Sequence, residues 1–342
     1  MGFIGVGSMG FSHLELFHRD CSRDCQAVAI CATNKSNIAR SKEIAPEVIL
    51  HKKEADLIRS DLDAVVVSSP NFTHVPLALE ALRAGKHVFL EKPVGITPAE
   101  CRKLLRATQK TNLTLMIGHE LRYSPYFAKI KKLVDAGAVG EPKMVWCKEF
   151  RGPLMPKSRN WIQDRRRSGG CLVDKNCHHF DLMNWWVGAH PKRVAAFGGN
   201  AVNRVIEGPN QVHDHVALSW EYDNKVRGTL HLCLFAHDPP KETLEMGIVG
   251  DKGVLQTNLD KLEILHWQRG KRGGEARIHK IKAKRGIGWG GHLGFAEMHP
   301  AFIKSIRTGQ KPLTSAANCI DGTLLAIAGE ESIRTGKITT IR

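Results

Sequence analysis

The first 120 residues alternate between short apolar runs and longer segments with helical periodicity. Apolar runs stand at residues 27–31, 63–67, 87–90 and 113–117, and amphipathic segments separate them. This alternation is typical of strand–helix–strand units, which build a parallel sheet covered by helices. The chain is therefore predicted to open with an α/β domain, residues 1–120, built on a doubly wound parallel sheet.

The pattern changes after residue 120. Runs such as HVALSWEY, VRGTLHLCLF and KLEILHW alternate between apolar and polar residues, as strands with one solvated face do. Helical patterns occur near residues 174–187 and again from about 295 to 336. A chain of 342 residues is long enough for two domains. We therefore expect residues 121–342 to form an α+β domain with a largely antiparallel, open sheet.

An apolar run at the start of the chain leads into a Gly-x-Gly-x-x-Gly loop and then into a helical segment. Its glycines are Gly5, Gly7 and Gly10, with Ser8 and Met9 between them. Such glycines permit a tight turn and close approach of the backbone to a pyrophosphate, whose charge the helix N-terminus favours. In this context the motif predicts a Rossmann dinucleotide-binding domain with these five residues at the cofactor. A glycine turn used for packing alone is the alternative.

The end of the second predicted strand indicates which dinucleotide binds. An acidic residue at this position holds the adenine ribose of NAD. This chain instead has Thr33, Asn34 and Lys35 there, followed by Arg40. Because small polar residues and a cation suit a 2′-phosphate, these cofactor-binding candidates lean toward NADP over NAD. NAD bound without the acidic contact, with both cations merely solvated, is the alternative.

Composition limits the other classes of function. The formal net charge of +16 suits anionic partners, but the basic residues are scattered and no nucleic-acid-binding motif accompanies them. The nine cysteines include no CxxC pair, as expected of reduced thiols in a cytoplasmic protein. No apolar run approaches the length of a membrane span. We therefore expect a cytoplasmic protein with no specific nucleic-acid partner and no membrane association.

Two polar clusters interrupt the apolar pattern. Lys92 stands between an apolar strand and a proline in LEKP, where a lysine that simply reaches solvent is the plain interpretation. Asp174, His178 and Asp181 have the spacing i, i+4 and i+7, so they share one face if the segment is helical. A histidine is a common general base for a hydroxyl proton, and a carboxylate near it can orient it. The second cluster therefore has the residue types of a proton-transfer site.

Two other interpretations of the second cluster stay open. Asp174, Cys177, His178 and His179 are candidate metal ligands, but no recognised zinc spacing is present, and the two histidines are expected on different helix faces. We therefore expect no metal. Alternatively, the segment is an amphipathic helix whose polar face covers an interface.

Three segments together resemble one family: GVGSMG at residues 5–10, SSPNFTHVPLALEALRAGKHVFLEKP at 68–93 and SGGCLVDKNCHHFDLMNWWVG at 168–188. They are similar to the Gfo/Idh/MocA oxidoreductases, the family of glucose–fructose oxidoreductase and inositol dehydrogenase. The resemblance implies a Rossmann domain followed by an α+β domain, in an enzyme that transfers hydride between nicotinamide and a CH–OH group. It also implies a homodimer or homotetramer formed through the C-terminal sheet.

The resemblance also implies roles for the polar residues. Lys92 lies beside the nicotinamide and the substrate oxygen, where its charge stabilises negative charge in the transition state. His178 exchanges the hydroxyl proton, Asp174 is its catalytic and substrate-binding partner, and Asp181 is structural. The further cofactor contacts are Ser69, Pro70, Asn71, His74 and Glu91, with packing at a helix start as the alternative for His74. The further substrate contacts are Arg122, Trp161 and His292, with Arg159 and Asp164 as additional pocket candidates and packing as the alternative for each.

The sequence thus predicts an NAD(P)-dependent dehydrogenase or reductase acting on a sugar, sugar acid or cyclitol. One alternative, known among relatives, is a redox-neutral glycosidase or epimerase that keeps its NAD(P) bound. Another is a dinucleotide- or sugar-sensing regulator without turnover. The chain departs from the family pattern at Asn176, where glycine is common, and the neighbouring Lys175 is expected at the surface. This departure bears on the substrate more than on the fold.

Overall fold

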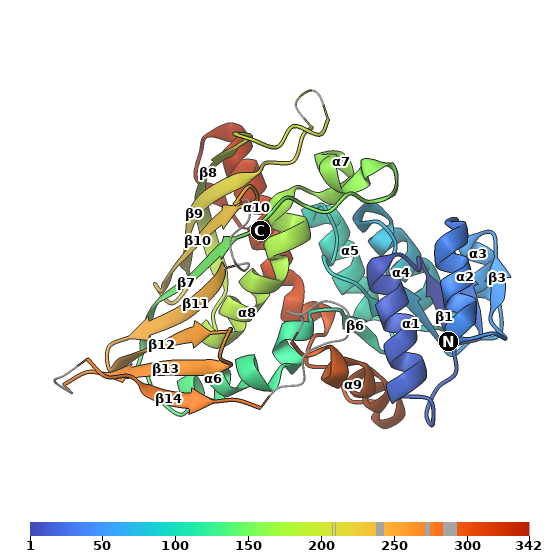
Figure 1. The fold of residues 1–342 in the computed structure, drawn as a ribbon, viewed down its shortest axis with the longest axis horizontal. Helices are drawn as coiled ribbons and strands as arrows, with labels where there is room; N and C mark the ends of the chain where they lie inside the picture. The colour runs from blue at the N-terminus through green and yellow to red at the C-terminus, as the bar shows by residue number, and fades with distance from the viewer. Residues whose placement is uncertain (207, 209, 237–242, 271–273, 283–292, 342) are drawn as a thin grey trace. The chain divides into compact units, whose positions relative to one another are not determined.

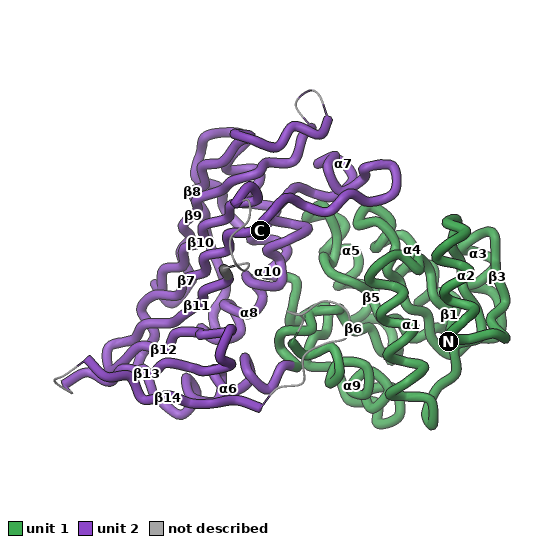
Figure 2. Tube along the Cα trace, in the orientation of Figure 1, with its two compact units in different colours: residues 1–123, 284–320 green, residues 124–283, 321–342 purple. Residues whose placement is uncertain are grey.

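The computed structural model describes residues 1–206, 208, 210–236, 243–270, 274–282 and 293–341. The chain divides into two compact units, coloured green and purple in Figure 2. Unit 1 contains residues 1–123 and 284–320, and unit 2 contains residues 124–283 and 321–342. None of the helices in the described part combines the length and the hydropathy that a membrane crossing demands.

Unit 1 is built on a parallel sheet that has six strands among the described residues, in the order β3-β2-β1-β4-β5-β6 (Figure 1). The strands are β1 (Gly2–Ile4), β2 (Ala29–Cys31), β3 (Ile49–His51), β4 (Ala64–Val67), β5 (His87–Leu90) and β6 (Leu115–Ile117). The α-helices are α1 (Ser8–Asp20), α2 (Lys35–Ile44), α3 (Glu54–Arg59), α4 (His74–Arg83), α5 (Pro98–Thr108) and α9 (Phe295–Thr308). Short 3₁₀ turns are η1 (Asn71–Thr73) and η2 (Glu120–Tyr123).

The apolar runs of the sequence form the buried strands of this sheet. All four residues of β4 are buried, and β4 pairs with both β1 and β5. Sequence analysis does not detect β3, because this three-residue strand lies at the sheet edge with Ile49 63% and Leu50 40% exposed. Because the strands are parallel, their carboxyl ends share one edge, and the loops that follow β1, β4 and β5 emerge together there.

Helix α9 packs on α1, although the two are far apart in the sequence. The ring centroids of Phe17 on α1 and of His299 and Phe302 on α9 lie 4.5 and 6.1 Å apart, respectively. Residues 284–320, which the sequence places in the second domain, therefore belong to unit 1, and the expected boundary at residue 120 lies at Tyr123. Helix α10 (Ala316–Thr335) begins in unit 1 and continues into unit 2.

Unit 2 contains a second sheet, which has nine strands among the described residues, in the order β14-β13-β12-β11-β7-β10-β9-β8-β15. The strands are β7 (Pro142–Phe150), β8 (Pro191–Gly199), β9 (His215–Tyr222), β10 (Arg227–Cys233), β11 (Thr243–Gly250), β12 (Gly253–Asn258), β13 (Glu263–Gln268), β14 (Arg277–Lys280) and β15 (Thr339–Thr340). The other elements are α6 (Pro125–Asp135), η3 (Ser158–Gln163), α7 (Arg165–Ser168), the π-helical η4 (Leu172–Asn176) and α8 (Cys177–Val187). Neighbouring strands are antiparallel apart from the β7–β10 pair.

One face of this second sheet is covered by helices and the other is open (Figure 1). On the covered face, the ring of Phe180 from α8 packs edge-on against Trp220 of β9, with centroids 5.3 Å apart. On the open face, Phe197 of β8 is 80% exposed and Met144 of β7 is 48% exposed. The predicted fold class is confirmed, because a doubly wound parallel sheet is followed by a largely antiparallel, open one.

Substitution of Gly322 by alanine is expected to destabilise unit 2, where α10 crosses α8. A Cβ at this position would lie 2.8 Å from both Asp181 N and Cys177 O, which are backbone atoms that cannot move aside. We expect the free energy of unfolding to fall by about 1–3 kcal/mol, the usual cost of overpacking, measured by urea denaturation.

Gly329→Ala is the matched control, because it lies on the same helix and brings the same gain in helix propensity. Its Cβ would lie 2.7 Å from the Leu172 Cδ1 methyl group, at the end of a flexible side chain. Equal stabilities for the two variants would contradict the backbone clash.

Candidate active site

The glycine loop has the geometry that a pyrophosphate site requires. Gly5 has a φ of +82°, which favours glycine. A Cβ on Gly10 would lie 1.8 Å from Gly5 O, so only glycine fits there. Gly7 has open space around it, and as the N-cap of α1 it offers no capping side chain to the first N–H groups of that helix. The loop, with Ser8 and Met9 as the first residues of α1, thus fits a dinucleotide pyrophosphate.

The end of β2 presents a helix cap and a cation. Asn34 Oδ1 accepts a hydrogen bond from Asn37 N at 3.0 Å and so caps α2, directly after the exposed Thr33. Lys35 is the first residue of α2 and is exposed. The Arg40 guanidinium, by contrast, lies 3.9 Å from the centroid of the Phe11 ring. Lys35 is therefore the cation placed at a helix N-terminus, where an anion binds favourably.

His74 joins the loops that follow β4 and β5. It is 1% exposed, and its Nε2 and Nδ1 lie 2.9 Å from Ser69 O and from Pro93 O, respectively. Burial lowers the pKa of His74, and its two ring nitrogens face these two carbonyl acceptors. Pro70 and the buried Asn71 stand at the start of η1 in the same loop. This geometry favours the packing role for His74, and its contact with the cofactor stays a prediction.

Glu91 and Lys92 directly follow β5, and the Lys92–Pro93 peptide bond is cis. Glu91 is 5% exposed, with its Oε1 2.8 Å from His13 Nε2 on α1, and its Oε2 accepts a hydrogen bond from Lys92 N at 3.1 Å. A Cβ on Gly118 would lie 2.7 Å from that Oε1, so a glycine at 118 leaves room for the carboxylate. The Glu91 carboxylate thus faces α1, and its predicted contact with the cofactor stays a prediction.

Asp174 and His178 lie where a π-helical turn continues into α8 in unit 2. Asp174 belongs to η4, and His178 is the second residue of α8. Four residues separate them, across the point where the π-helical turn ends and α8 begins. They are 9% and 4% exposed, respectively. Because π-helical turns are frequent at functional sites, the predicted pair stands where a reactive site is common.

A buried carboxylate holds the start of this helix. Glu330 of α10, in the final AGEES segment, accepts a hydrogen bond from Leu172 N at 2.9 Å. Gly170 has a φ of +105°, and a Cβ there would lie 2.2 Å from Glu330 Cδ. The paired glycines before Asp174 are thus required by a left-handed backbone and by the approach of Glu330.

Glu149, on the covered face of β7, contacts four polar side chains. It is 4% exposed, and its oxygens lie 3.1 Å from Lys175 Nζ and 3.8 Å from an Arg151 guanidinium nitrogen. Asn176 Nδ2 donates to Glu149 at 2.9 Å, and His179 Nδ1 lies 3.5 Å away. Burial pushes the pKa of Glu149 upward, but the charges of Lys175, His179 and Arg151 hold it below its ordinary value. Sequence analysis missed Glu149, which no motif marks.

One expectation about this helix is wrong. The sequence predicts Lys175 at the surface, but its side chain is 16% exposed and pairs with Glu149. The placement of His178 and His179 on different helix faces stays a prediction, and their ring centroids lie 4.3 Å apart. Asn176 contacts both Glu149 and His179 Nδ1, the latter at 3.1 Å. These polar contacts explain why asparagine is accommodated where the family commonly has glycine.

Of two predicted substrate contacts, the structure describes Arg122 but not His292. Arg122 is 5% exposed and donates from its guanidinium to Asn318 O at 2.8 Å, so packing within unit 1 accounts for part of its role. His292 lies outside the described residues. Substrate contact therefore stays a prediction for both.

The loop before Asp174 carries the remaining pocket candidates. Trp161 is half-buried in η3 and follows Arg159 and Asn160, whose φ values of 56° and 47° are left-handed. Non-glycine residues in this region store strain, which is common near functional sites. Asp164 caps α7, because its Oδ1 accepts a hydrogen bond from Arg166 N at 3.0 Å. The Asp164 carboxylate is thus engaged in a helix cap, while Trp161 stays a candidate substrate contact.

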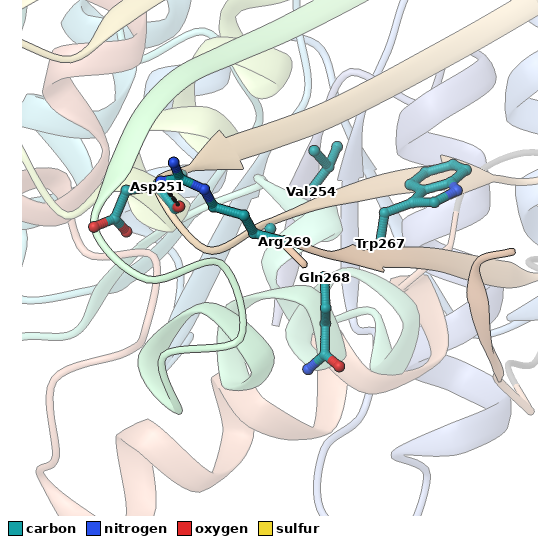
Figure 3. Close-up of a pocket in the computed structure, with 7 residues that line it drawn as sticks. Asp251, Val254, Trp267, Gln268 and Arg269 are labelled. Carbon is teal, nitrogen blue, oxygen red and sulfur yellow. Dashed lines mark hydrogen bonds between the residues drawn. The ribbon is translucent and has the colours of Figure 1, made fainter. Parts of the chain in front are cut away.

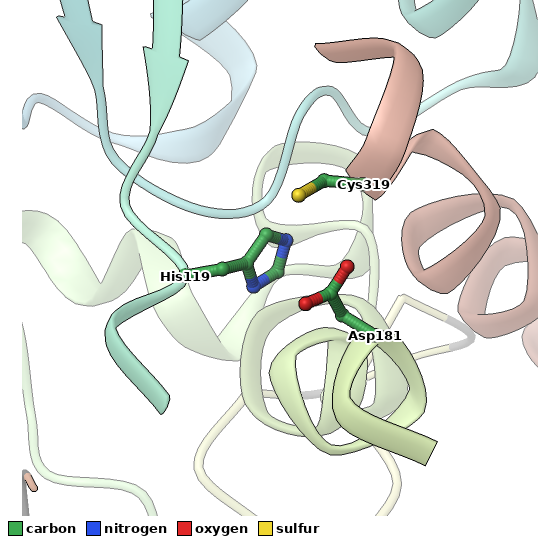
Figure 4. Close-up of side chains that lie close together, drawn as sticks. All are labelled: His119, Asp181 and Cys319. Atoms are coloured by element: carbon green, nitrogen blue, oxygen red, sulfur yellow. The ribbon is translucent and has the colours of Figure 1, made fainter. Parts of the chain in front are cut away.

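Potential metal ligands also occur in unit 1. His119, after β6, and Cys319, near the start of α10, are buried and bring ligand atoms within 4.8 Å of each other (Figure 4). Figure 4 also labels Asp181, which belongs to α8 of unit 2. Neither Asp174 nor His178 belongs to this pair.

A surface hollow in unit 2 lies away from the predicted site (Figure 3). The residues labelled there are Asp251, Val254, Trp267, Gln268 and Arg269. The hollow is at the β11–β12 turn, where Gly250 pairs with Pro142 of β7. Glu149 is seven residues further along β7, about 23 Å away at 3.3 Å per residue. The hollow is therefore not part of the candidate active site.

Two family models match the chain. Residues 1–119 match the model described as "Oxidoreductase family, NAD-binding Rossmann fold", and residues 127–256 match the GFO/IDH/MocA C-terminal domain. Among curated proteins, the chain is 25% identical over 339 residues to a myo-inositol 2-dehydrogenase of Thermotoga maritima, covering 97% of this chain and 96% of that protein. It is 33% identical over 203 residues to the uncharacterized oxidoreductase YrbE of Bacillus subtilis. This match covers 59% of this chain and 58% of that protein.

Solved structures share the same fold. A levoglucosan dehydrogenase in complex with NADH has a TM-score of 0.84 at 22% identity, covering 100% of this chain and 98% of that one. An oxidoreductase domain protein from Kribbella flavida has a TM-score of 0.84, also at 22% identity and with the same coverage. At these identities the similarity establishes the fold.

Substitution of Glu149 by glutamine is expected to destabilise the protein at neutral pH, because it leaves the partly buried Lys175 without its counter-charge. Breaking a buried ion pair costs about 3–5 kcal/mol. Because the folded-state pKa of Glu149 is lowered, its ionisation contributes stability above the ordinary value of 4.5, and this contribution is lost as pH falls through the folded pKa. Urea unfolding should therefore show a difference between wild type and variant that shrinks below about pH 4.5.

Glu331→Gln is the control, because the carboxylate of Glu331 pairs with Arg334 on an exposed helix surface. This change should alter the stability by less than about 1 kcal/mol. A Glu149→Gln protein as stable as wild type at pH 7 would show that the buried network does not support the helix.

Proposed function

Because the chain belongs to the Gfo/Idh/MocA oxidoreductase family, we propose that it is an NAD(P)-dependent dehydrogenase of sugars, sugar acids or cyclitols. The observation that carries this proposal is the buried Asp174–His178 pair where a π-helical turn continues into α8, together with Lys92 directly after β5 in unit 1. A regulator without turnover would have no need of this set of side chains. The relatives named as inositol dehydrogenases support the substrate class.

In the proposed reaction, His178 takes the proton of the substrate hydroxyl that is oxidised. Asp174 orients the imidazole and binds a neighbouring hydroxyl. The Glu149 network lies on the adjacent turn and engages Lys175 and His179. His179 is engaged by Glu149 and Asn176, and the resemblance to the family assigns the proton transfer to its neighbour His178.

Lys92 supplies positive charge for the substrate oxygen. As the hydroxyl proton leaves, negative charge grows on that oxygen, and a fixed ammonium stabilises it. The glycine loop and the N-terminus of α1 would hold the dinucleotide pyrophosphate. When bound, the nicotinamide accepts or donates the hydride.

The choice between the two dinucleotides rests on the end of β2. The family model describes an NAD-binding domain, and the chain accordingly takes a nicotinamide dinucleotide. We place Lys35 at the adenosine 2′-phosphate, which makes NADP the preferred form, because an exposed cation at the first position of α2 suits that group.

Assembly and location complete the proposal. The exposed apolar side chains of Phe197 and Met144 on the open face of the sheet suit an interface between copies of this chain, in a homodimer or homotetramer. The described residues include all nine cysteines, and none of them forms a disulfide, which suits the reducing cytoplasm.

The first test is a spectrophotometric assay of the purified protein. It is mixed with NAD⁺ or NADP⁺ and with myo-inositol, D-glucose, levoglucosan or L-sorbose, and the absorbance of reduced nicotinamide is followed. We expect the absorbance to grow with at least one substrate. Lys92→Ala and His178→Ala should each lower kcat by about 10²- to 10⁴-fold while the affinity for the dinucleotide stays within about twofold.

Lys103→Ala, an exposed lysine of α5, is the control and should retain full turnover. Absence of growth, with cofactor retained through purification, would replace the proposal by redox-neutral cleavage or epimerisation. Absence of both turnover and dinucleotide binding would leave the family membership as a statement of fold alone.

Lys35→Ala is expected to change the preference between dinucleotides. Loss of one charge-assisted contact with the 2′-phosphate should raise KM for NADP⁺ by about tenfold or more and leave KM for NAD⁺ nearly unchanged. Lys42→Ala, in the last turn of the same helix, is the control and should affect neither value. An equal effect of Lys35→Ala on both dinucleotides would contradict the assignment of Lys35.

A further inference from the structure

Three buried side chains of unit 1 form a hydrogen-bonded chain that ends at Lys92. Lys92 N donates to Glu91 Oε2, and Glu91 Oε1 lies 2.8 Å from His13 Nε2. His13 Nδ1 lies 2.8 Å from His299 Nε2, and His299 Nδ1 lies 2.7 Å from Phe295 O. Both histidines are 0% exposed. These hydrogen bonds thus connect three segments of unit 1: α1 after the glycine loop, the turn around Lys92 after β5 (the lysine turn), and α9.

The number of protons in this chain follows from its donors and acceptors. Phe295 O can only accept, so His299 Nδ1 carries a proton, and His299 Nε2 is then the acceptor of a neutral ring. If His13 were neutral with its proton on Nε2, two lone pairs would face each other across 2.8 Å. A proton on His13 Nδ1 turns this contact into a hydrogen bond.

One proton is then shared between Glu91 and His13. Either His13 is an imidazolium beside an ionised Glu91, or the carboxyl group is protonated and donates to His13 Nε2. The group of three side chains carries no net charge in both arrangements. Burial and the charge of His13 hold the pKa of His299 well below its ordinary value, so His299 stays neutral and the positive charge, when present, is on His13.

The surroundings of the two histidines are aromatic. The His13 ring centroid lies 4.9 Å from that of Phe89, and His299 stacks on Phe89 at 5.8 Å with an interplanar angle of 9°. Phe17 packs edge-on against His299 at 4.5 Å. In such an apolar environment an unpartnered polar nitrogen is costly, which favours the fully hydrogen-bonded arrangement.

We propose that Glu91, His13 and His299 form a proton-sharing triad, with a proton on His13 Nδ1, that positions Lys92 for the reaction. The proposal rests on the role of Lys92 in the proposed function. The three are positioning residues, because they act through Lys92 and do not touch the reacting atoms. His13 lies five residues into α1 from Ser8, about 7.5 Å along the helix axis, so the triad ties the lysine turn to the helix that would hold the pyrophosphate.

Neutrality of the triad has a consequence for Lys92. An unshared Glu91 carboxylate would attract the neighbouring ammonium and compete with the substrate oxygen for it. A shared proton reduces this competition while the carboxylate still accepts from Lys92 N. The triad therefore fixes the backbone of Lys92 without drawing its side chain away from the substrate.

The position of the proton is testable without turnover. In protein labelled with ¹⁵N-histidine, NMR correlation of the ring nitrogens should show a hydrogen-bonded proton on His13 Nδ1 and a neutral His299 protonated on Nδ1. His299→Phe removes the acceptor, so the His13 Nδ1 proton signal should disappear in that variant. A neutral His13 protonated on Nε2 alone in the wild-type protein would overturn the proposal.

The effect on Lys92 is tested by kinetics with the myo-inositol, glucose, levoglucosan and sorbose panel. His299→Phe should lower kcat by about 10- to 100-fold, as expected of a misplaced catalytic group, and leave KM for the dinucleotide within about twofold. His299→Gln, whose amide can accept from His13 and donate to Phe295 O, should recover part of kcat. His18→Gln, an exposed histidine of the same α1 helix, is the control and should behave as wild type.

Lys92→Ala is measured alongside to separate the two proposals. If Lys92→Ala abolishes turnover but folded His299→Phe and His299→Gln proteins keep wild-type kcat, the triad is a packing feature and the proposal is overturned. If Lys92→Ala itself keeps wild-type turnover, the proposed function fails first and the positioning role fails with it. If His299→Phe does not fold, the decision rests on kcat of His299→Gln and on the wild-type NMR spectrum.

Discussion

A carboxylate in a protein interior is stable only when charges or hydrogen-bond donors compensate for its lost hydration, and this constraint organises both units of the chain. In unit 1, Glu91 is held by His13 and by the backbone of Lys92. In unit 2, Glu149 is compensated by Lys175, Asn176 and their neighbours. Each carboxylate thereby fixes a backbone segment that carries a proposed reactive side chain.

Glycine supplies the space that these carboxylates need. Gly118 leaves room for Glu91, and Gly170 leaves room for Glu330 at the start of the Asp174 helix. In each case a side chain on the glycine would meet the carboxylate at less than 3 Å. A motif glycine and a distant acidic residue are therefore parts of one local structure.

The features that the sequence reveals are those with local causes. The turn at Gly5 and the alternating apolar runs can be recognised because backbone geometry and burial act over a few residues. The exposed edge strand β3 gives no such pattern and is not detected. The return of α9 to unit 1 is also not detected, because its apolar stripe does not identify the helix on which it packs.

The partners of the site residues are hidden from the sequence for the same reason. His13 lies 78 residues from Glu91 and 286 residues from His299, and no periodicity connects positions at such separations. Lys175 resembles a surface lysine until Glu149, on a strand that precedes it in the chain, is known to face it. Motif analysis therefore finds reactive side chains, whereas the groups that set their charge and orientation require the structure.

Asn176 shows how such partners depend on one another. An asparagine amide placed where the family commonly has glycine is buried, with 0% exposure, and must find acceptors. Glu149 provides one, 27 residues away in the sequence, and His179 provides another contact on the same helix. Loss of the acceptor at 149 would leave the amide and Lys175 without their shared partner, so each residue is tolerated because the others are present.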